Sequence, residues 1–292
     1  MIHFLGIGVA QAISGAMGMA FWKINVFEEA GLELDMADKG IVSFYRMTYI
    51  LFALFGFIMP ALVFRRYMEL PDQDYLFIRK RMIWLIAGGV ALVFLAAYPV
   101  INVLNELNEQ VLLPGDTGRA IDKSDKETQM FIMYILYDRD VSVYLTNLLV
   151  IAFLPALGEE LFFRAVMLRL FTKFFKGIHA AVWIGAIFFS VYHFQFQGLL
   201  PRIFMGALLG YVFIITGNIW YSVLLHFLNN AFIVTLKWLQ ARDFSTEKME
   251  WFGSHDWTRV VAVISLLILV AWGIYSWRKA RHYQMESELL YR

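Results

Sequence analysis

The chain has 292 residues, of which 60% are hydrophobic and 17% are charged, a balance outside the usual range of soluble domains. Its 25 Lys and Arg residues are balanced by 24 Asp and Glu residues, so the sequence offers no basic surface for nucleic acid and we expect no nucleic-acid partner. Cys is absent, which excludes disulfides, thiol nucleophiles and Cys-ligated zinc. We therefore expect a protein that lies largely in lipid and whose nucleophile, if it has one, is an oxygen group or activated water.

Long apolar runs predict membrane-spanning helices, because about 20 apolar residues are needed to cross the hydrocarbon core. The candidate spans are 2–22, 41–64, 82–104, 141–175, 178–197, 201–216, 218–239 and 257–277. The first run lacks the basic segment and cleavage site of a secretory signal, so we interpret it as a retained helix. The run 141–175 is too long for one crossing at about 1.5 Å per residue, and Pro155 with Gly158 predicts a kink or break within it. The expected fold is all-α, a polytopic transmembrane helical bundle of about eight spans.

Basic residues in short connections predict the orientation of such a bundle. They form three clusters that alternation of the spans puts on one side: Arg65, Arg66, Arg79, Lys80 and Arg81; Arg169, Lys173 and Lys176; Arg278, Lys279 and Arg281. We therefore expect an integral, multi-pass protein of the plasma (inner) membrane with both termini in the cytoplasm. The acidic connection 105–140 then lies outside; its segment 123–126 is predicted to be flexible, and we assign it no chemistry.

Ionisable side chains inside apolar segments are costly, so each is a candidate functional residue. The first set lies in the run 158–164, where Glu159, Glu160 and Arg164 form an EExxxR pattern. Glu160 and Arg164 are four residues apart, share one helix face and can form an ion pair. Glu159 points about 100° away from that pair. It is left to face a cavity, where a carboxylate suits a general base.

Two further apolar segments carry polar side chains at helical spacing. Phe189 and His193 form an FxxxH pattern that stacks the ring and the imidazole on one face, and His226 and Asn230 are likewise four residues apart. A carboxylate, two imidazoles and a carboxamide can thus converge from three helices. Such a set can activate water and stabilise an oxyanion, the two requirements of peptide hydrolysis without a covalent nucleophile.

Each of these residues also has a purely structural interpretation. Glu160 and Arg164 alone fit an ion pair that locks a helix, and an intramembrane His is often a hydrogen-bonded residue of the core. Asn230 alone fits an interhelical hydrogen bond worth about 1 kcal/mol. Gly206 and Gly210 form a GxxxG pattern, which we interpret as a site of close helix contact rather than of chemistry.

The three motifs, in this order and approximate spacing, resemble the CAAX prenyl protease and bacteriocin-processing (CPBP) family, whose members include type II CAAX endopeptidase-like intramembrane proteases. The resemblance covers about residues 141–240, and the one departure is Ala165, where many members have Gly after the Arg. It implies an all-helical bundle in which a glutamate and a histidine activate water while a second histidine and an asparagine stabilise the oxyanion. The catalytic residues it implies are Glu159, His193, His226 and Asn230, with Glu160, Arg164 and Phe189 in supporting roles.

The resemblance divides the chain into 1–140, N-terminal transmembrane helices and outer loop; 141–240, the catalytic core; and 241–292, an outer loop, the last transmembrane helix and a basic cytoplasmic tail. It predicts a glutamate-dependent endopeptidase that cleaves a membrane-associated protein or peptide. No cofactor is expected: zinc is the older interpretation of the family, but the chain has no HExxH and its candidate His ligands lie on different helices.

Two alternatives belong to other functional classes. A proton-coupled transporter would use Glu159, His193 and His226 as a relay. A non-catalytic membrane scaffold or immunity protein would keep the fold and act by binding a partner.

Counting residues from the predicted cytoplasmic ends places Glu159 and His193 about 22–24 Å deep but His226 only about 10–12 Å deep. These residues can meet only if the turn at Thr216, Gly217 and Asn218 is itself buried in the bundle, or if the predicted helix ends are wrong.

Overall fold

The computed structural model describes residues 2–22, 39–68, 74–111, 113–247 and 258–280. Within these ranges the regular secondary structure is entirely helical, and seven helices are long and apolar enough to cross a membrane. A further apolar helix has 14 residues. The predicted all-α polytopic bundle of about eight spans is therefore confirmed.

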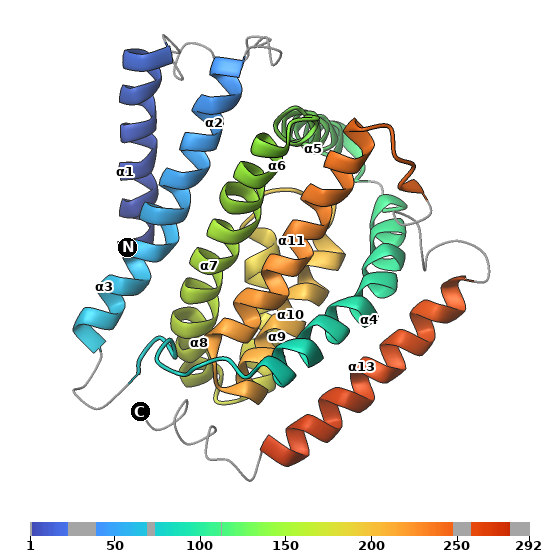
Figure 1. Ribbon diagram of the computed structural model, residues 1–292. Helices are drawn as coiled ribbons and strands as arrows, with labels where there is room; N and C mark the ends of the chain where they lie inside the picture. The colour runs from blue at the N-terminus through green and yellow to red at the C-terminus, as the bar shows by residue number, and fades with distance from the viewer. Residues whose placement is uncertain (1, 23–38, 69–73, 112, 248–257, 281–292) are drawn as a thin grey trace.

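The elements follow one another as shown in Figure 1. The first are α1 (Ile2–Met17) with its π-helical end η1 (Gly18–Trp22), the continuous helix of α2 (Lys39–Leu51), η2 (Phe52–Ile58) and α3 (Met59–Met68), and α4 (Trp84–Glu109). The next are α5 (Gly115–Leu136) and one long helix composed of α6 (Val141–Asn147), η3 (Leu148–Phe153), α7 (Leu154–Glu160), η4 (Leu161–Met167) and α8 (Leu168–Phe175). The last are α9 (Ile178–Val191), α10 (Leu199–Thr216), α11 (Ile219–Ala241) and α13 (Thr258–Ala280).

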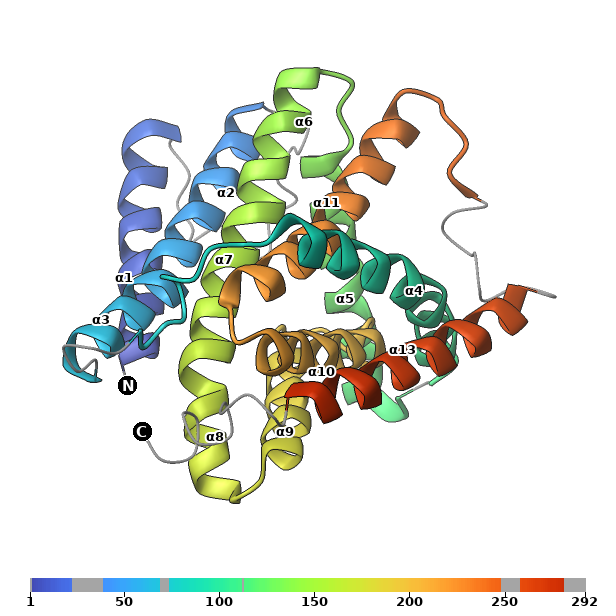
Figure 2. The ribbon, with the colours of Figure 1, turned by 60° about the horizontal axis from the view of Figure 1, so that its bottom comes forward.

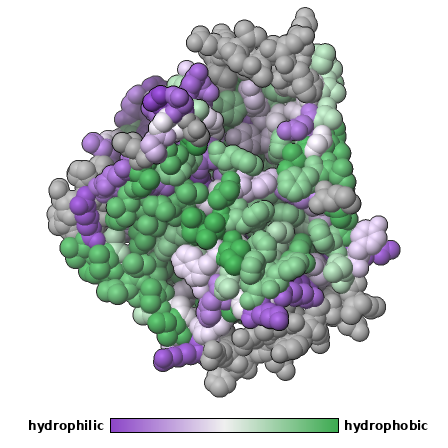
Figure 3. Space-filling model, turned by 180° about the vertical axis from the view of Figure 1, so that it is seen from behind, coloured by the Kyte–Doolittle hydropathy of each residue, from purple (hydrophilic) through white to green (hydrophobic). Residues whose placement is uncertain are grey.

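Helix α11 lies in the middle of the bundle (Figures 1 and 2). It packs against η3 and α7 of the long helix on one side and against α4 and α10 on the other. The α1–α3 hairpin covers the outer side of the long helix, whereas α13 runs along α4, with Arg259 bonded to Glu106 at 2.6 Å. Apolar side chains cover broad areas of the opposite face, with hydrophilic residues gathered toward its upper and lower ends (Figure 3), as expected of a surface that meets lipid.

The long helix 141–175 is continuous, so of the predicted kink or break the break is wrong. Pro155 lies at the start of α7, directly after the π-helical segment η3. Pro has no N–H to donate to the preceding turn, and the wider π-helical turn accommodates this without ending the helix. Gly158 instead allows close contact with η2, since a Cβ there would lie 3.1 Å from the Cβ of Phe57 and 3.2 Å from the carbonyl oxygen of Ala53.

Two further segments differ from their predictions. The span predicted at 178–197 ends as a helix at Val191, and the chain turns through Phe194 and Gly198, both with positive φ, before α10 begins. His193 therefore lies just beyond the helix end. Segment 123–126 is not a flexible loop but part of α5, where Lys126 pairs with Asp122 at 2.7 Å and Lys123 with Glu127 at 3.7 Å, both at the i,i+4 spacing that stabilises helices.

The three basic clusters lie toward one end of the bundle. The ends of α3, α8 and α13 that carry Arg65 and Arg66, Lys173 and Arg278 all lie toward the bottom of Figure 1, whereas α5 lies at the top. Arg281 of the tail cluster lies outside the described residues. The structure thus agrees with the common side predicted from charge, while the assignment of that side to the cytoplasm stays a prediction.

Candidate active site

Glu160 is the most deeply buried charged side chain of the site. Its side chain is 0% exposed, and its Oε1 lies 3.1 Å from Nη1 of Arg164, so the ion pair predicted from the spacing is present. The same oxygen lies 2.9 Å from Nδ1 of His226. This second bond joins residues 66 positions apart and had no signal in the sequence.

Glu159 lies on the other side of the same imidazole. Its Oε2 is 3.9 Å from Nε2 of His226 and is buried without a hydrogen-bond partner in the described part of the chain. Buried polar atoms without partners are rare in folded proteins and frequently have a functional explanation. His226 is therefore bracketed by two carboxylates, one bonded to Nδ1 and the other facing Nε2.

The ring of Phe189 is the apolar spacer of the site. The guanidinium carbon of Arg164 lies 4.7 Å from its centroid, and the imidazoles of His193 and His226 meet it edge to face at 5.0 and 5.8 Å. Nδ1 of His193 lies 2.9 Å from the carbonyl oxygen of Phe189. Because only a protonated Nδ1 can donate to a carbonyl, Nε2 of His193 is left as the nitrogen that can accept a proton.

A cavity of about 260 Å³ connects the predicted residues. His193, His226 and Asn230 line it together, with Arg202 and Asn105 among its other polar residues. Glu159 is not among the residues that line the cavity; its Oε2 lies 3.9 Å from Nε2 of His226, and its carboxylate is close enough to interact electrostatically with His193. The side-chain oxygen Oδ1 of Asn230 accepts a bond from Nδ2 of Asn229 at 3.2 Å. The side-chain nitrogen Nδ2 of Asn230 is therefore the group that can donate into the cavity.

The turn between α10 and α11, which precedes His226, is buried. Asn218 is only 2% exposed, and the segment 74–83 covers it. Its side chain donates to the carbonyls of Lys80 and Arg81 at 3.3 and 3.2 Å, and Trp220 donates to the carbonyl of Ile78 at 3.0 Å. The turn is thus buried, as the first alternative requires, and the helix predicted at 178–197 ends at Val191, so a predicted helix end was wrong as well.

The GxxxG pattern places α10 against α9. A Cβ at Gly206 would lie 3.1 Å from the Cα of Ala186, and one at Gly210 would lie 3.1 Å from Cγ1 of Val182. The interpretation as a close helix contact is confirmed. The carbonyl of Gly206 also accepts a bond from Nη2 of Arg164 at 3.1 Å, which ties α10 to the buried ion pair.

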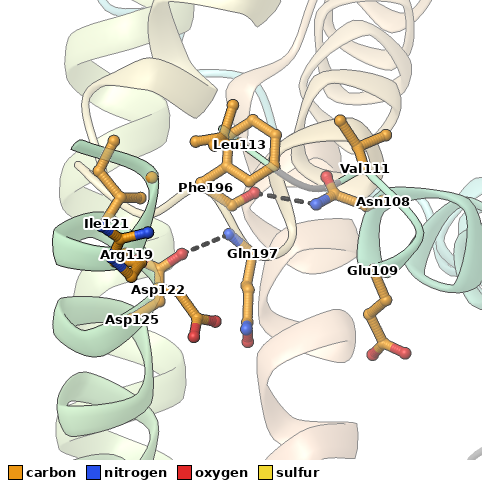
Figure 4. A pocket seen from close by; sticks show the side chains of 11 residues that line it. Asn108, Glu109, Val111, Leu113, Arg119, Ile121, Asp122, Asp125, Phe196 and Gln197 are labelled. Atoms are coloured by element: carbon orange, nitrogen blue, oxygen red, sulfur yellow. Dashed lines mark hydrogen bonds between the residues drawn. The ribbon is translucent and has the colours of Figure 1, made fainter. Parts of the chain in front are cut away.

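Two residues that had no signal in the sequence hold the turn after His193 by hydrogen bonds to its backbone (Figure 4). Asp125 of α5 accepts a bond from the backbone N–H of Gln197 at 2.7 Å, and Asn108 of α4 donates to the carbonyl of Phe196 at 3.0 Å. Asn108 also accepts from the N–H of Leu200 at 2.9 Å. Asp125 and Asn108 are each 2% exposed. Their separation from the motifs along the chain left no pattern that could have pointed to them.

A metal centre needs three or more protein ligands placed around one ion. No group of three or more His, Asp or Glu side chains within the described ranges is placed to bind one ion. Nδ1 of His226 is bonded to Glu160 and Nδ1 of His193 to Phe189, which leaves Nε2 of each ring as the nitrogen that could bind an ion. Because no third ligand is placed with them in the described residues, no step is assigned to a metal.

The structure is a polytopic helical bundle in which buried carboxylates and imidazoles lie beside a cavity lined by His193, His226 and Asn230, and it defines a multi-pass membrane protein. Residues 141–232 match the family model described as type II CAAX prenyl endopeptidase, Rce1-like. This confirms the resemblance read from the three motifs and supports, at the level of the family, a membrane endopeptidase. No curated protein and no solved structure matches the chain.

Proposed function

We propose that this chain is an intramembrane, glutamate-dependent endopeptidase that hydrolyses a peptide bond of a membrane-associated protein or peptide. The observation that carries the proposal is the unpartnered, buried Oε2 of Glu159 beside His226, next to a cavity that His193, His226 and Asn230 line together. A carboxylate oxygen without a partner can take a proton from water, and the neighbouring groups are of the types that bind the resulting charge.

In this proposal Glu159 and His193 activate water between them. The water loses a proton to the carboxylate, and its oxygen forms a bond to the scissile carbonyl carbon. Asn230 and a protonated Nε2 of His226 then donate hydrogen bonds to the oxyanion of the tetrahedral intermediate. The carbon–nitrogen bond breaks as the proton held by Glu159 passes to the leaving amine, which regenerates the carboxylate.

Glu160, Arg164 and Phe189 hold this arrangement in place. Glu160 engages Nδ1 of His226, which turns Nε2 toward Glu159. Arg164 balances the charge of Glu160, and the Phe189 ring separates the two imidazoles. A ring held from one nitrogen in this way keeps its orientation, as supporting carboxylates do for imidazoles in other sites.

Arg202 indicates what kind of substrate end the cavity accepts. It lines the cavity, with Nη1 and Nη2 bonded to Gln195 and Nε buried without a hydrogen-bond partner in the described residues. A guanidinium in this position suits a substrate carboxylate. We therefore expect a peptide segment that presents a side-chain or C-terminal carboxylate next to the scissile bond. The proposal needs no cofactor, and it places the protein in the plasma (inner) membrane with both termini cytoplasmic.

The test is cleavage of a quenched-fluorescent peptide library, prenylated peptides included, by the purified full chain in detergent. We expect chelator-resistant cleavage that falls at least about a hundredfold in Glu159→Gln and in His193→Ala, the size expected for loss of acid–base catalysis. Glu127→Gln, at a carboxylate on α5 that pairs with Lys123, is the matched control and should keep full activity.

Chelator-sensitive cleavage would overturn the metal-free mechanism. Folded wild-type protein that cleaves none of these peptides, together with pH-coupled flux in vesicles that Glu159→Gln abolishes, would favour the transporter. Absence of both activities would favour the non-catalytic scaffold.

A further inference from the structure

A second and larger cavity lies far from the catalytic residues, between α13 and the pair α9 and α10. Its volume is about 610 Å³, within the range of about 300–1,000 Å³ that is usual for sites of small organic ligands. Figure 2 shows α13 passing beside α10 at this place. We call it the α13 groove.

The body of the α13 groove is apolar and faces the surface that meets lipid. Leu208 and Leu269 form part of its floor, and the half-exposed side chains of Val270 and Ile274 border it. A Cβ added at Gly273 would meet nothing within 4 Å, so the groove is open beside this residue. Such a shape and lining suit a hydrocarbon chain.

One end of the groove is polar, aromatic and basic. His179 bonds to the hydroxyl of Tyr211 at 2.9 Å and stacks obliquely on Trp277 at 4.7 Å between centroids. Arg278 also lines this end, and the exposed Lys176 lies three residues before His179. The residues that line the groove include no Asp or Glu. Trp and Tyr are typical of the interface between hydrocarbon and water, which places this end at the level of lipid headgroups.

We propose that the α13 groove is a binding site for one anionic phospholipid, with an acyl chain along α10 and α13 and the phosphate at Arg278 and His179. A neutral lipid would fill the apolar part equally well, because bilayer chains gain little by moving from lipid to an apolar protein surface. The selectivity therefore comes from charge complementarity at the basic end. Basic pockets between transmembrane helices recognise acidic headgroups in this way.

The test uses native mass spectrometry of the full chain released from detergent, with dioleoyl phosphatidylglycerol and dioleoyl phosphatidylcholine at equal concentrations. We expect one phosphatidylglycerol to be retained in preference to phosphatidylcholine. Arg278→Gln should lower that preference about fivefold, the contribution of one basic residue near an anionic headgroup. Gly273→Trp should abolish retention, because the indole fills the open space.

Gly88→Trp is the matched control, since a Cβ at Gly88 on α4 also meets nothing within 4 Å but lies outside the groove. It should retain the lipid as the wild type does. Equal retention of both lipids by the wild type, or unchanged retention in Gly273→Trp, would overturn the proposal. A mass of two chains that Gly273→Trp converts to one would assign the groove to a second copy and would overturn it as well.

Discussion

The sharpest prediction concerns Glu160, whose role distinguishes a structural ion pair from a part of the active site. Its Oε1 is shared by Arg164 and His226, and its side chain is wholly buried. Glu160→Gln preserves the shape and removes the charge. Breaking a buried pair by removing one partner costs about 3–5 kcal/mol, because the other charge is left uncompensated. Gly206 still accepts from Arg164 and the new amide still offers an oxygen, so we expect the lower end, about 3 kcal/mol.

The double variant Glu160→Gln, Arg164→Met separates the two roles. It leaves no buried charge from this pair, so most of the lost stability should return. Peptide cleavage should not return, because His226 still lacks the carboxylate at its Nδ1. Stability is measured by SDS unfolding in mixed micelles, and kcat with a cleaved peptide from the library.

The reasoning about His226 would be refuted if the double variant recovered both stability and kcat. In that case Glu160 and Arg164 would be only an ion pair that locks the helix. A single Glu160→Gln variant as stable as the wild type would refute the burial argument itself.

Three further predictions concern other parts of the fold. Gly206→Val should destabilise the protein by about 1–3 kcal/mol through overpacking and slow cleavage, because its side chain would meet Ala186 and Phe189. Gly88→Val, in open space, is the control, and equal midpoints of SDS unfolding for the two variants would contradict the close contact. Asp125→Asn should lower kcat several-fold and speed amide exchange of residues 194–198, because its carboxylate accepts from Gln197, whereas Asp122→Asn, at an exposed carboxylate, should do neither. Asp140 caps α6, and its bond from the backbone N–H of Ser142 holds its pKa below the ordinary value of 3.8. A lowered pKa means that the cap stabilises α6 above pH 3.8 and that this stabilisation is lost as the pH falls below it. Below pH 3.8, exchange of the first amides of α6 should therefore accelerate in the wild type. In Asp140→Ala it should be independent of pH after correction for intrinsic rates.

Most of the fold could be predicted from the sequence because lipid imposes a simple requirement on it. A spanning helix must be apolar over a fixed length, and the runs that begin near residues 2, 41, 82, 141, 201, 218 and 257 all became candidate spans. The run at 178–197 was misjudged in its length, since Phe194 and Gly198 turn the chain by adopting positive φ. A run of apolar residues gives no signal of such a turn.

The sequence predicts pairs of residues on one helix but not the contacts that join residues of different helices. Spacing along one helix predicts pairs such as Glu160 with Arg164, because both partners lie on the same face. The contacts of His226 with Glu159 and Glu160 depend on how α11 and α7 cross, and the depth of His226 depends on the segment that covers Asn218. Contacts of this kind leave no periodic signal.

Glu159 and Glu160 make different contacts because they point in different directions from the helix. Neighbouring residues on a helix point about 100° apart, yet both carboxylates reach the same imidazole because His226 stands between their two directions, at 2.9 Å from Glu160 and 3.9 Å from Glu159. Glu160 forms the ion pair with Arg164 and serves as the fixed partner, whereas Glu159 forms no ion pair with Arg or Lys in the described residues; Oε2 of each glutamate is left without a hydrogen-bond partner there. The arginine four residues on thus determines which glutamate is held. Moving the cation to pair with Glu159 would therefore exchange the two roles and would leave the carboxylate without an ion pair at the fully buried position of Glu160.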